Sequence, residues 1–238
     1  MQPAMALRQR RREPEDMDDP ALQSEQYAHA LNSLSRLNFA AGTAQVFWRH
    51  LRPIMRTRPR GTWRLLDVAT GGGDIPLRLW RLARNERFDL QIAGCDISER
   101  AVHQAQARAD AAGANVQYFR QDVVREPISG EYDFVISSLF IHHLSDGEAI
   151  CAFRNLAPAT RRLLLINDLR RCLWGLLVAF VATRVLTTSR VARVDGLRSV
   201  RAAYTMAEIR ALATAAELTQ AKVLRHWPAR WLLEWSRP

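Results

Sequence analysis

The sequence predicts an α/β fold built on a mostly parallel sheet that is covered by helices on both faces. From Trp63 onward, short apolar runs alternate with helical stretches, which is the pattern of consecutive βαβ units. A parallel sheet of this kind is buried on both faces, so its strands are expected to be apolar throughout. The 238 residues, 48% hydrophobic and 24% charged, suit one such domain with added segments.

Five strands and their helices are predicted within the central part of the chain. The strands are Trp63–Val68, Leu90–Cys95, Val116–Arg120, Tyr132–Ser138 and Arg162–Asn167. The helices between them are Ile75–Arg84, Glu99–Ala112 and Gly147–Leu156. A later helix, Thr205–Ala216, precedes two closing strands, Lys222–Trp227 and Arg230–Trp235. A turn at Pro228 would join these two as a hairpin and add an antiparallel strand to the sheet.

Segments at both sides of this core are predicted to have separate roles. Residues 1–20 have Arg-rich and then acidic composition without an apolar signal region, which predicts a disordered tail. Residues 21–60 are predicted to form an N-terminal helical cap, with one or two helices over Leu22–Met55 that the Pro- and Gly-containing segment Arg52–Gly61 breaks. The remaining residues, 61–238, form the main domain, with a helical insertion at residues 170–204. Within it, Cys172–Leu186 is apolar on all sides, and its longest uninterrupted apolar run is too short to span a bilayer.

The distribution of charge limits the classes of partner. The net charge is +10, and residues 160–201 alone carry nine Arg against two Asp. A nucleic-acid-binding face usually spreads its basic residues among aromatics, which this segment does not do. A basic segment beside an apolar run also fits an acidic or amphipathic ligand, or anionic lipid. The three cysteines form no CxxC pair, so neither a disulfide framework nor a zinc site is predicted, and a reducing compartment fits best.

The most informative stretch is the glycine loop at residues 69–73. The run LLDVATGGGDIP leads from a strand through three glycines into a helix. Such a loop lies at the carboxyl end of the first strand, where open α/β sheets bind ligands. A tight strand-to-helix turn is the alternative interpretation. Pro76 replaces the third small residue of the dinucleotide fingerprint, and no GK[ST] sequence follows, so neither a nicotinamide or flavin site nor a P-loop is predicted.

Two carboxylates are predicted at the same edge of the sheet as the glycine loop. Asp96 follows the second strand, in the position where an acid holds a ribose diol. Asp122 follows the third strand. The alternative for Asp96 is capping the next helix, a role for which Ser98 competes.

In combination, the motifs LLDVATGGGD, GCDIS, QDVV and YDFVISSLFIHHLSD resemble those of the class I S-adenosylmethionine-dependent methyltransferases. The resemblance covers about residues 27–235 and is greatest to the C-methyltransferases of ubiquinone and menaquinone biosynthesis. It implies a Rossmann-like, seven-stranded, mostly parallel sheet with an N-terminal helical extension and a helical lid after the fifth strand. Ala69 stands where the family commonly has the first glycine of the loop.

The resemblance also implies a cofactor, S-adenosyl-L-methionine, and a set of residues that bind it. Asp67, Thr70, Gly71 and Gly73 would line its methionine part. Asp96 would hold the ribose hydroxyls with Ile97 against the adenine, Asp122 would accept from the adenine amino group beside Val123, and Ser137 would lie near the sulfonium.

Catalytic candidates follow the fourth and fifth strands. Methyl transfer from a sulfonium needs mainly positioning and electrostatics, and a phenol, enol or ring-carbon acceptor also gains from a base. His142 and His143, in the sequence FIHHL, are the candidate bases, although such a pair can equally pack or hydrogen-bond. Asp168, at the end of the fifth strand, is another candidate, with helix capping as its alternative.

These features together predict an enzyme that methylates a small, lipophilic acceptor at carbon or oxygen. The acceptor is expected to be aromatic, quinone-like or polyketide-like. Residues 172–186 would line its apolar site or, alternatively, form a core helix. We expect a cytoplasmic protein without a nucleic-acid partner or a metal, and contact with a membrane surface as an open alternative. The sequence leaves the oligomeric state open. An RNA methyltransferase and a non-catalytic cofactor-binding protein are the competing functions; the absence of a [DN]-P-P-[YF] motif disfavours the first.

Overall fold

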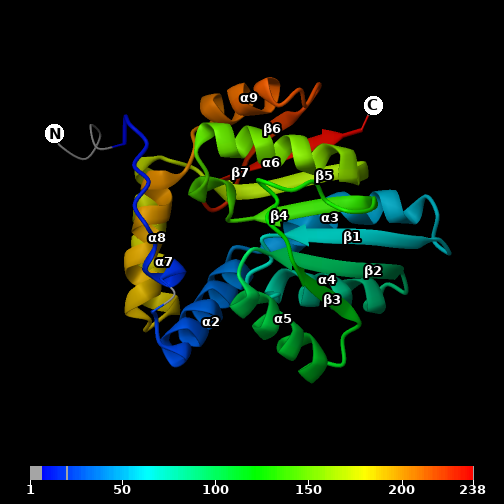
Figure 1. The fold of residues 1–238 in the computed structure, drawn as a ribbon, viewed down its shortest axis with the longest axis horizontal. Helices are drawn as coiled ribbons and strands as arrows, with labels where there is room; N and C mark the ends of the chain where they lie inside the picture. The colour runs from blue at the N-terminus through cyan, green and yellow to red at the C-terminus, as the bar shows by residue number, and fades with distance from the viewer. Residues whose placement is uncertain (1–6, 20, 238) are drawn as a thin grey trace.

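A computed structural model describes residues 7–19 and 21–237 and shows a seven-stranded sheet between two layers of helices (Figure 1). The strand order is β3-β2-β1-β4-β5-β7-β6. The pairs from β3 to β5 are all parallel, and β7 is antiparallel to both β5 and β6. The chain order reverses between β1 and β4, so this point is the topological switch at which open α/β sheets bind ligands.

The predicted strands and helices are present, with small shifts at their ends. The strands are β1 (Thr62–Val68), β2 (Asp89–Asp96), β3 (Val116–Arg120), β4 (Tyr132–Ser138), β5 (Thr160–Leu169), β6 (Lys222–His226) and β7 (Arg230–Ser236). The α-helices are α2 (Ser24–Ala40), α3 (Thr43–Arg56), α4 (Asp74–Asn85), α5 (Glu99–Ala111), α6 (Asp146–Ala159), α7 (Leu173–Leu186), α8 (Arg190–Ala202) and α9 (Met206–Ala215). Two short 3₁₀ helices are η1 (Asp16–Asp18) and η2 (Ile141–His143).

Alternating residues of the central strands build two separate hydrophobic cores. On β1, Trp63 and Leu65 face the core that also contains residues of α3 and α4, whereas Leu66 and Val68 face the core formed with α6 and α9. β4 and β5 divide their side chains in the same way. Because successive side chains of a strand point to opposite faces, a central strand covered on both sides must be apolar at nearly every position.

The N-terminal cap consists of two helices that are separated at Gly42, and the second ends at Arg56, inside the predicted break at Arg52–Gly61. Gly42 has φ 65°, a left-handed conformation that glycine adopts without strain. α3 then continues through Pro53 to Arg56. The proline costs one helical hydrogen bond, but the buried face of α3, which includes Phe47 and Leu51, packs on the sheet and outweighs that loss.

Residues 7–19 do not behave as the predicted disordered tail. They run along α8 (Figure 1), and we refer to them as the N-terminal strap. Arg10 donates from Nη2 to the carbonyl oxygens of His142 and Leu144, at 2.8 and 2.6 Å. Asp195 of α8 accepts from the backbone N–H groups of Asp16 and Met17, at 2.9 and 3.0 Å. The charged composition that suggested disorder therefore finds specific partners, while residues 1–6 and 20 of that prediction lie outside the described residues.

Among the described residues, no helix combines the length and the apolar character that crossing a membrane requires.

Candidate functional site

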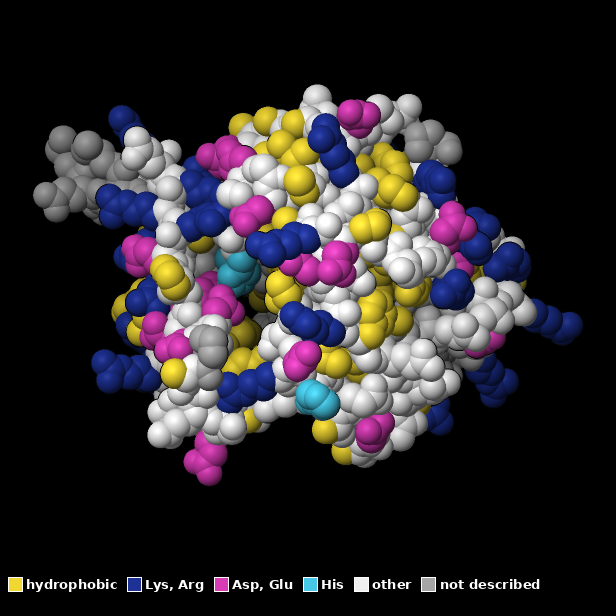
Figure 2. Space-filling model, viewed as in Figure 1, with side chains coloured by type: hydrophobic (Ala, Val, Ile, Leu, Met, Phe, Trp, Pro, Cys, Tyr) yellow, Lys and Arg dark blue, Asp and Glu magenta, His cyan; other side chains and the backbone are white. Residues whose placement is uncertain are grey.

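A cavity of about 1210 Å³ opens at the carboxyl edge of the parallel strands. Its walls come from α2, the glycine loop, the ends of β2 and β3, the segment after β4, helices α7 and α8, and residues 227–230. In the space-filling view a hollow is visible on this face among acidic, basic and histidine side chains (Figure 2). Since a typical small-molecule site measures about 300–1,000 Å³, this cavity has room for more than one ligand.

The glycine loop bends tightly between β1 and α4. Ala69, Gly71 and Gly73 have φ values of 55°, 53° and 71°, so even the alanine adopts the left-handed conformation. The Thr70 hydroxyl donates to Asp67 at 2.7 Å, which ties the loop to the end of β1. An added Cβ at Gly71 would meet no atom within 4 Å, so the space beside this glycine is open to the cavity.

Gly73 lacks a side chain for a different reason. A Cβ there would lie 2.6 Å from the Tyr118 hydroxyl and 3.0 Å from the Ala105 Cβ. Gly73 does not line the cavity, in contrast to its predicted contact with the cofactor. Its small size serves the packing of the α4 N-terminus on α5 and β3. Ser137 is likewise fully buried and donates to the Val68 carbonyl at 2.9 Å, so it links β4 to β1 and does not face the cavity.

Asp96 is held at the cavity wall by two backbone N–H groups. One carboxylate oxygen accepts from Gly71 and the other from Ser98, both at 2.9 Å. The Ser98 side chain caps α5 by accepting from Ala101, so the capping alternative for Asp96 is wrong. Exposed Ile97 adjoins Asp96 on the same wall.

Asp122 also lines the cavity, beside the predicted neighbour Val123. Its Oδ1 accepts from the backbone N–H groups of Val124 and Arg125, at 3.0 and 3.2 Å. These bonds fix the carboxylate at the end of β3, next to the wall that contains Asp96.

Within the described part of the chain no ion pair involves Asp67, Asp74 or Asp96, although the charges of Arg108 and Arg78 oppose the effect of burial on Asp74. Burial raises the pKa of Asp67 to about 8, with the charges of Asp74 and Asp96 adding to it and the Thr70 hydrogen bond opposing it. Burial also raises the pKa values of Asp74 and Asp96. A cationic ligand at this place would reverse these shifts, because an opposite charge stabilises the ionised carboxylates.

His142 and Asp168 form a buried pair. Asp168 accepts from the backbone N–H of His142 at 3.0 Å and contacts its ring Nδ1 at 2.7 Å. Burial alone would lower the pKa of His142, but the charge and hydrogen bond of Asp168, together with Glu15, raise it to about 10. His142 is therefore a cation at neutral pH in this arrangement. Asp168 is fully buried, does not line the cavity and does not cap α7, whose first turn is capped by Cys172.

His143 has the opposite electrostatic character, although its ring lies 4.2 Å from that of His142. Burial and the neighbouring charge of His142 lower the pKa of His143 to about 4. Its imidazole is thus neutral at pH 7 and lines the cavity. Of the two predicted bases, only His143 carries a free lone pair at neutral pH, and its low pKa makes it a weak base.

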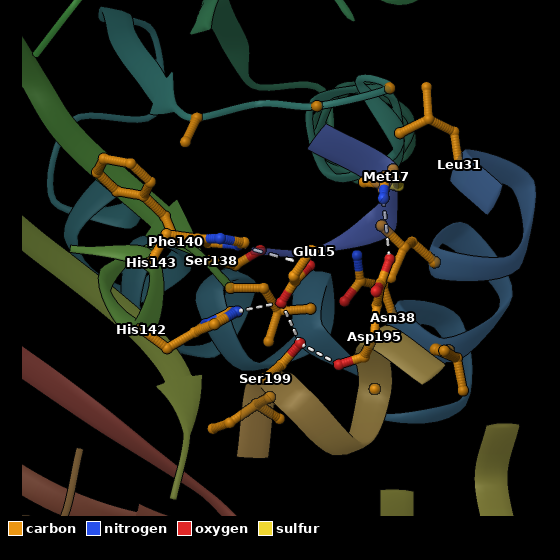
Figure 3. Close-up of a pocket in the computed structure, with 18 of the residues that line it drawn as sticks. Glu15, Met17, Leu31, Asn38, Ser138, Phe140, His142, His143, Asp195 and Ser199 are labelled. Atoms are coloured by element: carbon orange, nitrogen blue, oxygen red, sulfur yellow. Dashed lines mark hydrogen bonds and ion pairs between the residues drawn. The ribbon is translucent and has the colours of Figure 1, made fainter. Parts of the chain in front are cut away.

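Glu15, which the sequence did not suggest, reaches into the cavity from the strap (Figure 3). Its Oε1 lies 3.5 Å from His142 Nε2, and its Oε2 lies 4.0 Å from His143 Nε2. The Ser199 hydroxyl also donates to the Glu15 carboxylate. Glu15, His142 and His143 place their ligand-type atoms within 4.8 Å of one another, as a metal site would require.

Arg230 is a second charged group that the sequence did not suggest. It is buried, lines the cavity and donates from Nη1 to Thr43 at 2.8 Å and to Asn167 at 3.0 Å. Its Nε has no hydrogen-bond partner among the described residues, and burial lowers its pKa to about 10. Only its topological position, at the start of β7 next to β5, brings it to the site.

Helix α7 has one face toward the cavity and one toward solvent. Gly175, Val178, Ala179 and Ala182 line the cavity. The opposite face exposes six large apolar side chains: Leu173, Trp174, Leu177, Phe180, Val181 and Val185. The helix that was expected either to line an apolar site or to be buried in the core therefore does the first, and much of its surface is uncovered.

Comparison with known proteins finds a family match for the central part of the chain. Residues 65–162 match the family described as "Methyltransferase domain". No curated protein matches the chain significantly.

Several solved structures share the fold. The magnesium protoporphyrin IX methyltransferase of Synechocystis PCC 6803 with bound SAH is 19% identical at a TM-score of 0.58, over 92% of this chain and 90% of that one. The plantazolicin methyltransferase BpumL in complex with SAH is 15% identical at a TM-score of 0.66, over 92% and 90%. A putative O-methyltransferase from Nostoc punctiforme PCC 73102 is 14% identical at a TM-score of 0.61, over 87% of this chain and 60% of its own.

Proposed function

We propose that this chain transfers the methyl group of S-adenosylmethionine to a small lipophilic acceptor with an aromatic, quinone-like or polyketide-like ring. The match of residues 65–162 to a methyltransferase domain supports the reaction, and methyltransferases that share the fold were solved with SAH. The observation that carries this proposal is the cavity, which extends from the glycine loop to the side of α7 that carries Val178, Ala179 and Ala182. Two structural neighbours, described as methyltransferases of a porphyrin and of plantazolicin, also act on acceptors other than nucleic acid.

The glycine-loop end of the cavity fits the cofactor. We assign the ribose hydroxyls to Asp96, the adenine to Ile97, Asp122 and Val123, and the methionine part to Asp67, Thr70 and Gly71. The acids supply negative charge for a ligand that carries a sulfonium and an ammonium group, and such a ligand would lower the pKa of Asp67, which burial raises to about 8. When bound, the cofactor supplies an electrophilic methyl group, and the protein aligns the acceptor for in-line displacement.

The other end of the cavity fits the acceptor. The small and apolar side chains of α7 provide surface for a lipophilic ring, and His142 and His143 lie beside it after β4. We assign to His142 the electrostatic stabilisation of negative charge on the acceptor, because it is a cation, and to Asp168 the positioning of His142. His143 is the neutral group that can accept the acceptor's proton.

The test of the acceptor class uses methyl-labelled cofactor, a whole-cell extract that contains lipids, small molecules and RNA, and mass spectrometry of the labelled product. We expect a labelled lipophilic molecule. Replacing Val178, which lines the cavity, by Asn should raise KM for that acceptor. The matched variant Val181→Asn changes the solvent-exposed face of the same helix and should leave KM unchanged. Label in RNA, or in hydrophilic acceptors alone, would contradict the proposal.

We further infer that the exposed apolar face of α7 contacts a membrane surface, from which a lipophilic acceptor can enter. Arg170 and Arg184 flank this face, and cations beside an apolar helix face favour anionic lipid. Sedimentation with vesicles that contain anionic lipid should retain the protein at low salt. Leu177→Glu on this face should abolish retention, whereas Ala207→Glu, on the exposed side of α9, should not. Equal loss or no loss in both variants would refute the contact.

A further inference from the structure

The Glu15 carboxylate enters the cavity beside both histidines (Figure 3). Asp18 of the same strap also lines the cavity, and its Oδ2 lies 3.7 Å from His143 Nδ1. The Glu15 side chain is only 11% exposed. Although burial would raise its pKa, the hydrogen bond to His142, the charges of both histidines and the Ser199 hydroxyl lower it to about 2. The residues around Glu15 therefore form a seat for an anionic oxygen, with an imidazolium and a hydroxyl as donors.

The strap that delivers Glu15 is held without a buried apolar anchor. None of its described residues is fully buried. Its contacts are ion pairs and hydrogen bonds, such as those of Arg198 with Asp16 and Glu13. Ion pairs at partly exposed sites contribute little each and weaken with salt. Residues 13–19 can therefore be displaced at a small cost compared with unfolding a helix that packs in the core, while Arg10, whose side chain is 13% exposed and donates to four oxygens, holds the other end of the strap.

Displacement of the strap would change the charge of the cavity. Four acids that lie in or near this end, Glu13, Glu15, Asp16 and Asp18, belong to the strap. The groups that stay are His142, His143, Ser199 and Arg198, together with Asp195. The remaining groups favour binding of an anion. His142 would keep its ion pair with Asp168 but lose the one with Glu15, which leaves a buried cation without its second carboxylate partner.

We propose that the seat of the Glu15 carboxylate is the acceptor's anion subsite, which takes an ionised phenol or enol oxygen or a carboxylate, and that Glu15 occupies it until the acceptor arrives. This inference rests on the proposed function, because it gives the acceptor an acidic oxygen next to its lipophilic body. Glu15 thus acts as an internal competitor of the acceptor, and Ser199 and His142 are specificity-determining residues.

The test measures binding of two probes, 4-nitrophenol and benzoate, to the full chain by calorimetry, with absorbance of the nitrophenolate as a second signal. Glu15→Ala should bind at least one probe about tenfold tighter or more, because it opens a seat with charge-assisted hydrogen bonds. Glu15→Gln should also bind the probes more tightly than the wild type does, because it removes the negative charge that competes with the anion. The control variant Glu99→Ala removes an exposed acid that belongs neither to the strap nor to the cavity and should bind as the wild type does. A gain for nitrophenol assigns the seat to an ionised hydroxyl, and a gain for benzoate assigns it to a carboxylate.

Three results would overturn the inference. In the first, both probes bind to Glu15→Ala no better than to the wild type. In the second, the double variant Glu15→Ala/Ser199→Ala binds the probes as tightly as Glu15→Ala does. In the third, probe binding appears only after addition of Zn²⁺, which would assign Glu15 and the histidines to a cation. S-adenosylhomocysteine binding, measured on the same samples, separates this failure from that of the proposed function. If the variants bind S-adenosylhomocysteine but show no gain for the probes, only the subsite is refuted.

Discussion

Asp168 contacts His142 twice, through the backbone N–H at 3.0 Å and through ring Nδ1 at 2.7 Å. The double contact fixes the orientation of a ring that has no freedom to turn, because both residues are buried. It also directs Nε2 toward the cavity, where Glu15 lies. A residue at the end of β5 thereby controls the charge of a residue that follows β4.

We expect Asp168→Asn to lower the pKa of His142, since Asp168 supplies the charge that keeps the ring protonated. The variant should also lose about 3–5 kcal/mol of unfolding free energy, the cost of breaking a buried pair. NMR titration of the histidine rings and urea unfolding measure the two effects. Asp133→Asn is the control: it removes a buried acid that bonds the Arg64 backbone and should cost stability without moving the His142 titration. Unchanged titration in Asp168→Asn would show that another group sets the charge.

Cofactor binding should release a proton from Asp67. Burial raises its pKa to about 8, so the unliganded carboxyl is mostly protonated at pH 7. A bound cation favours the ionised form, and the affinity for S-adenosylmethionine should therefore rise with pH, by up to about tenfold per unit, until it levels off near pH 8. Calorimetry in buffers of different ionisation enthalpy counts the protons. Asp67→Asn should remove the proton release, and a pH-independent affinity in the wild type would contradict the assignment.

Asp96→Asn should weaken S-adenosylmethionine binding by about 10–100-fold. This is the expected effect of losing the hydrogen bonds that the ribose hydroxyls would donate to the charged carboxylate. Asparagine keeps the shape of the side chain but has one acceptor oxygen, so it keeps the bond from Gly71 or the bond from Ser98 and loses the other. Asp89→Asn, at the opposite end of β2, is the matched control and should bind as the wild type does. If both variants retain full affinity, Asp96 does not hold the ribose.

The two glycines of the loop should respond differently to alanine. Gly73→Ala places a Cβ 2.6 Å from the Tyr118 hydroxyl at φ 71°, so both a clash and backbone strain reduce stability. Gly71→Ala adds a methyl group in open space and costs only the strain of the left-handed conformation, about 1–2 kcal/mol. We expect Gly73→Ala to lower the unfolding midpoint more and Gly71→Ala to weaken cofactor binding more. The reverse order in thermal unfolding and calorimetry would refute these separate roles.

The framework of the fold could be predicted because it depends on local patterns. Strands that are buried on both faces show as apolar runs, and the loop at residues 69–73 shows its glycines directly. Asp96 and Asp122 could be placed because parallel strands end at the same edge of the sheet. Ser137 and Gly73 were assigned to the cofactor by resemblance, whereas the structure places their contacts within the protein.

The other end of the site depends on contacts between residues that are far apart in the sequence. Glu15 meets His142 across more than a hundred residues, and Arg230 meets Thr43 across nearly the whole chain. A charged stretch at an N-terminus has the composition of a disordered tail until its partners on α8 are known. Helix α8 itself was included only in a general helical insertion, because its many charges obscure the apolar pattern.

The most direct test of the account is a crystal structure of the protein with S-adenosylhomocysteine. We predict that the ribose hydroxyls lie within hydrogen-bond distance of Asp96, that the adenine lies against Ile97 near Asp122, and that the sulfur points toward the end of the cavity formed by α7 and the histidines. Density for the nucleoside at another place, or an empty glycine loop at saturating ligand, would contradict it.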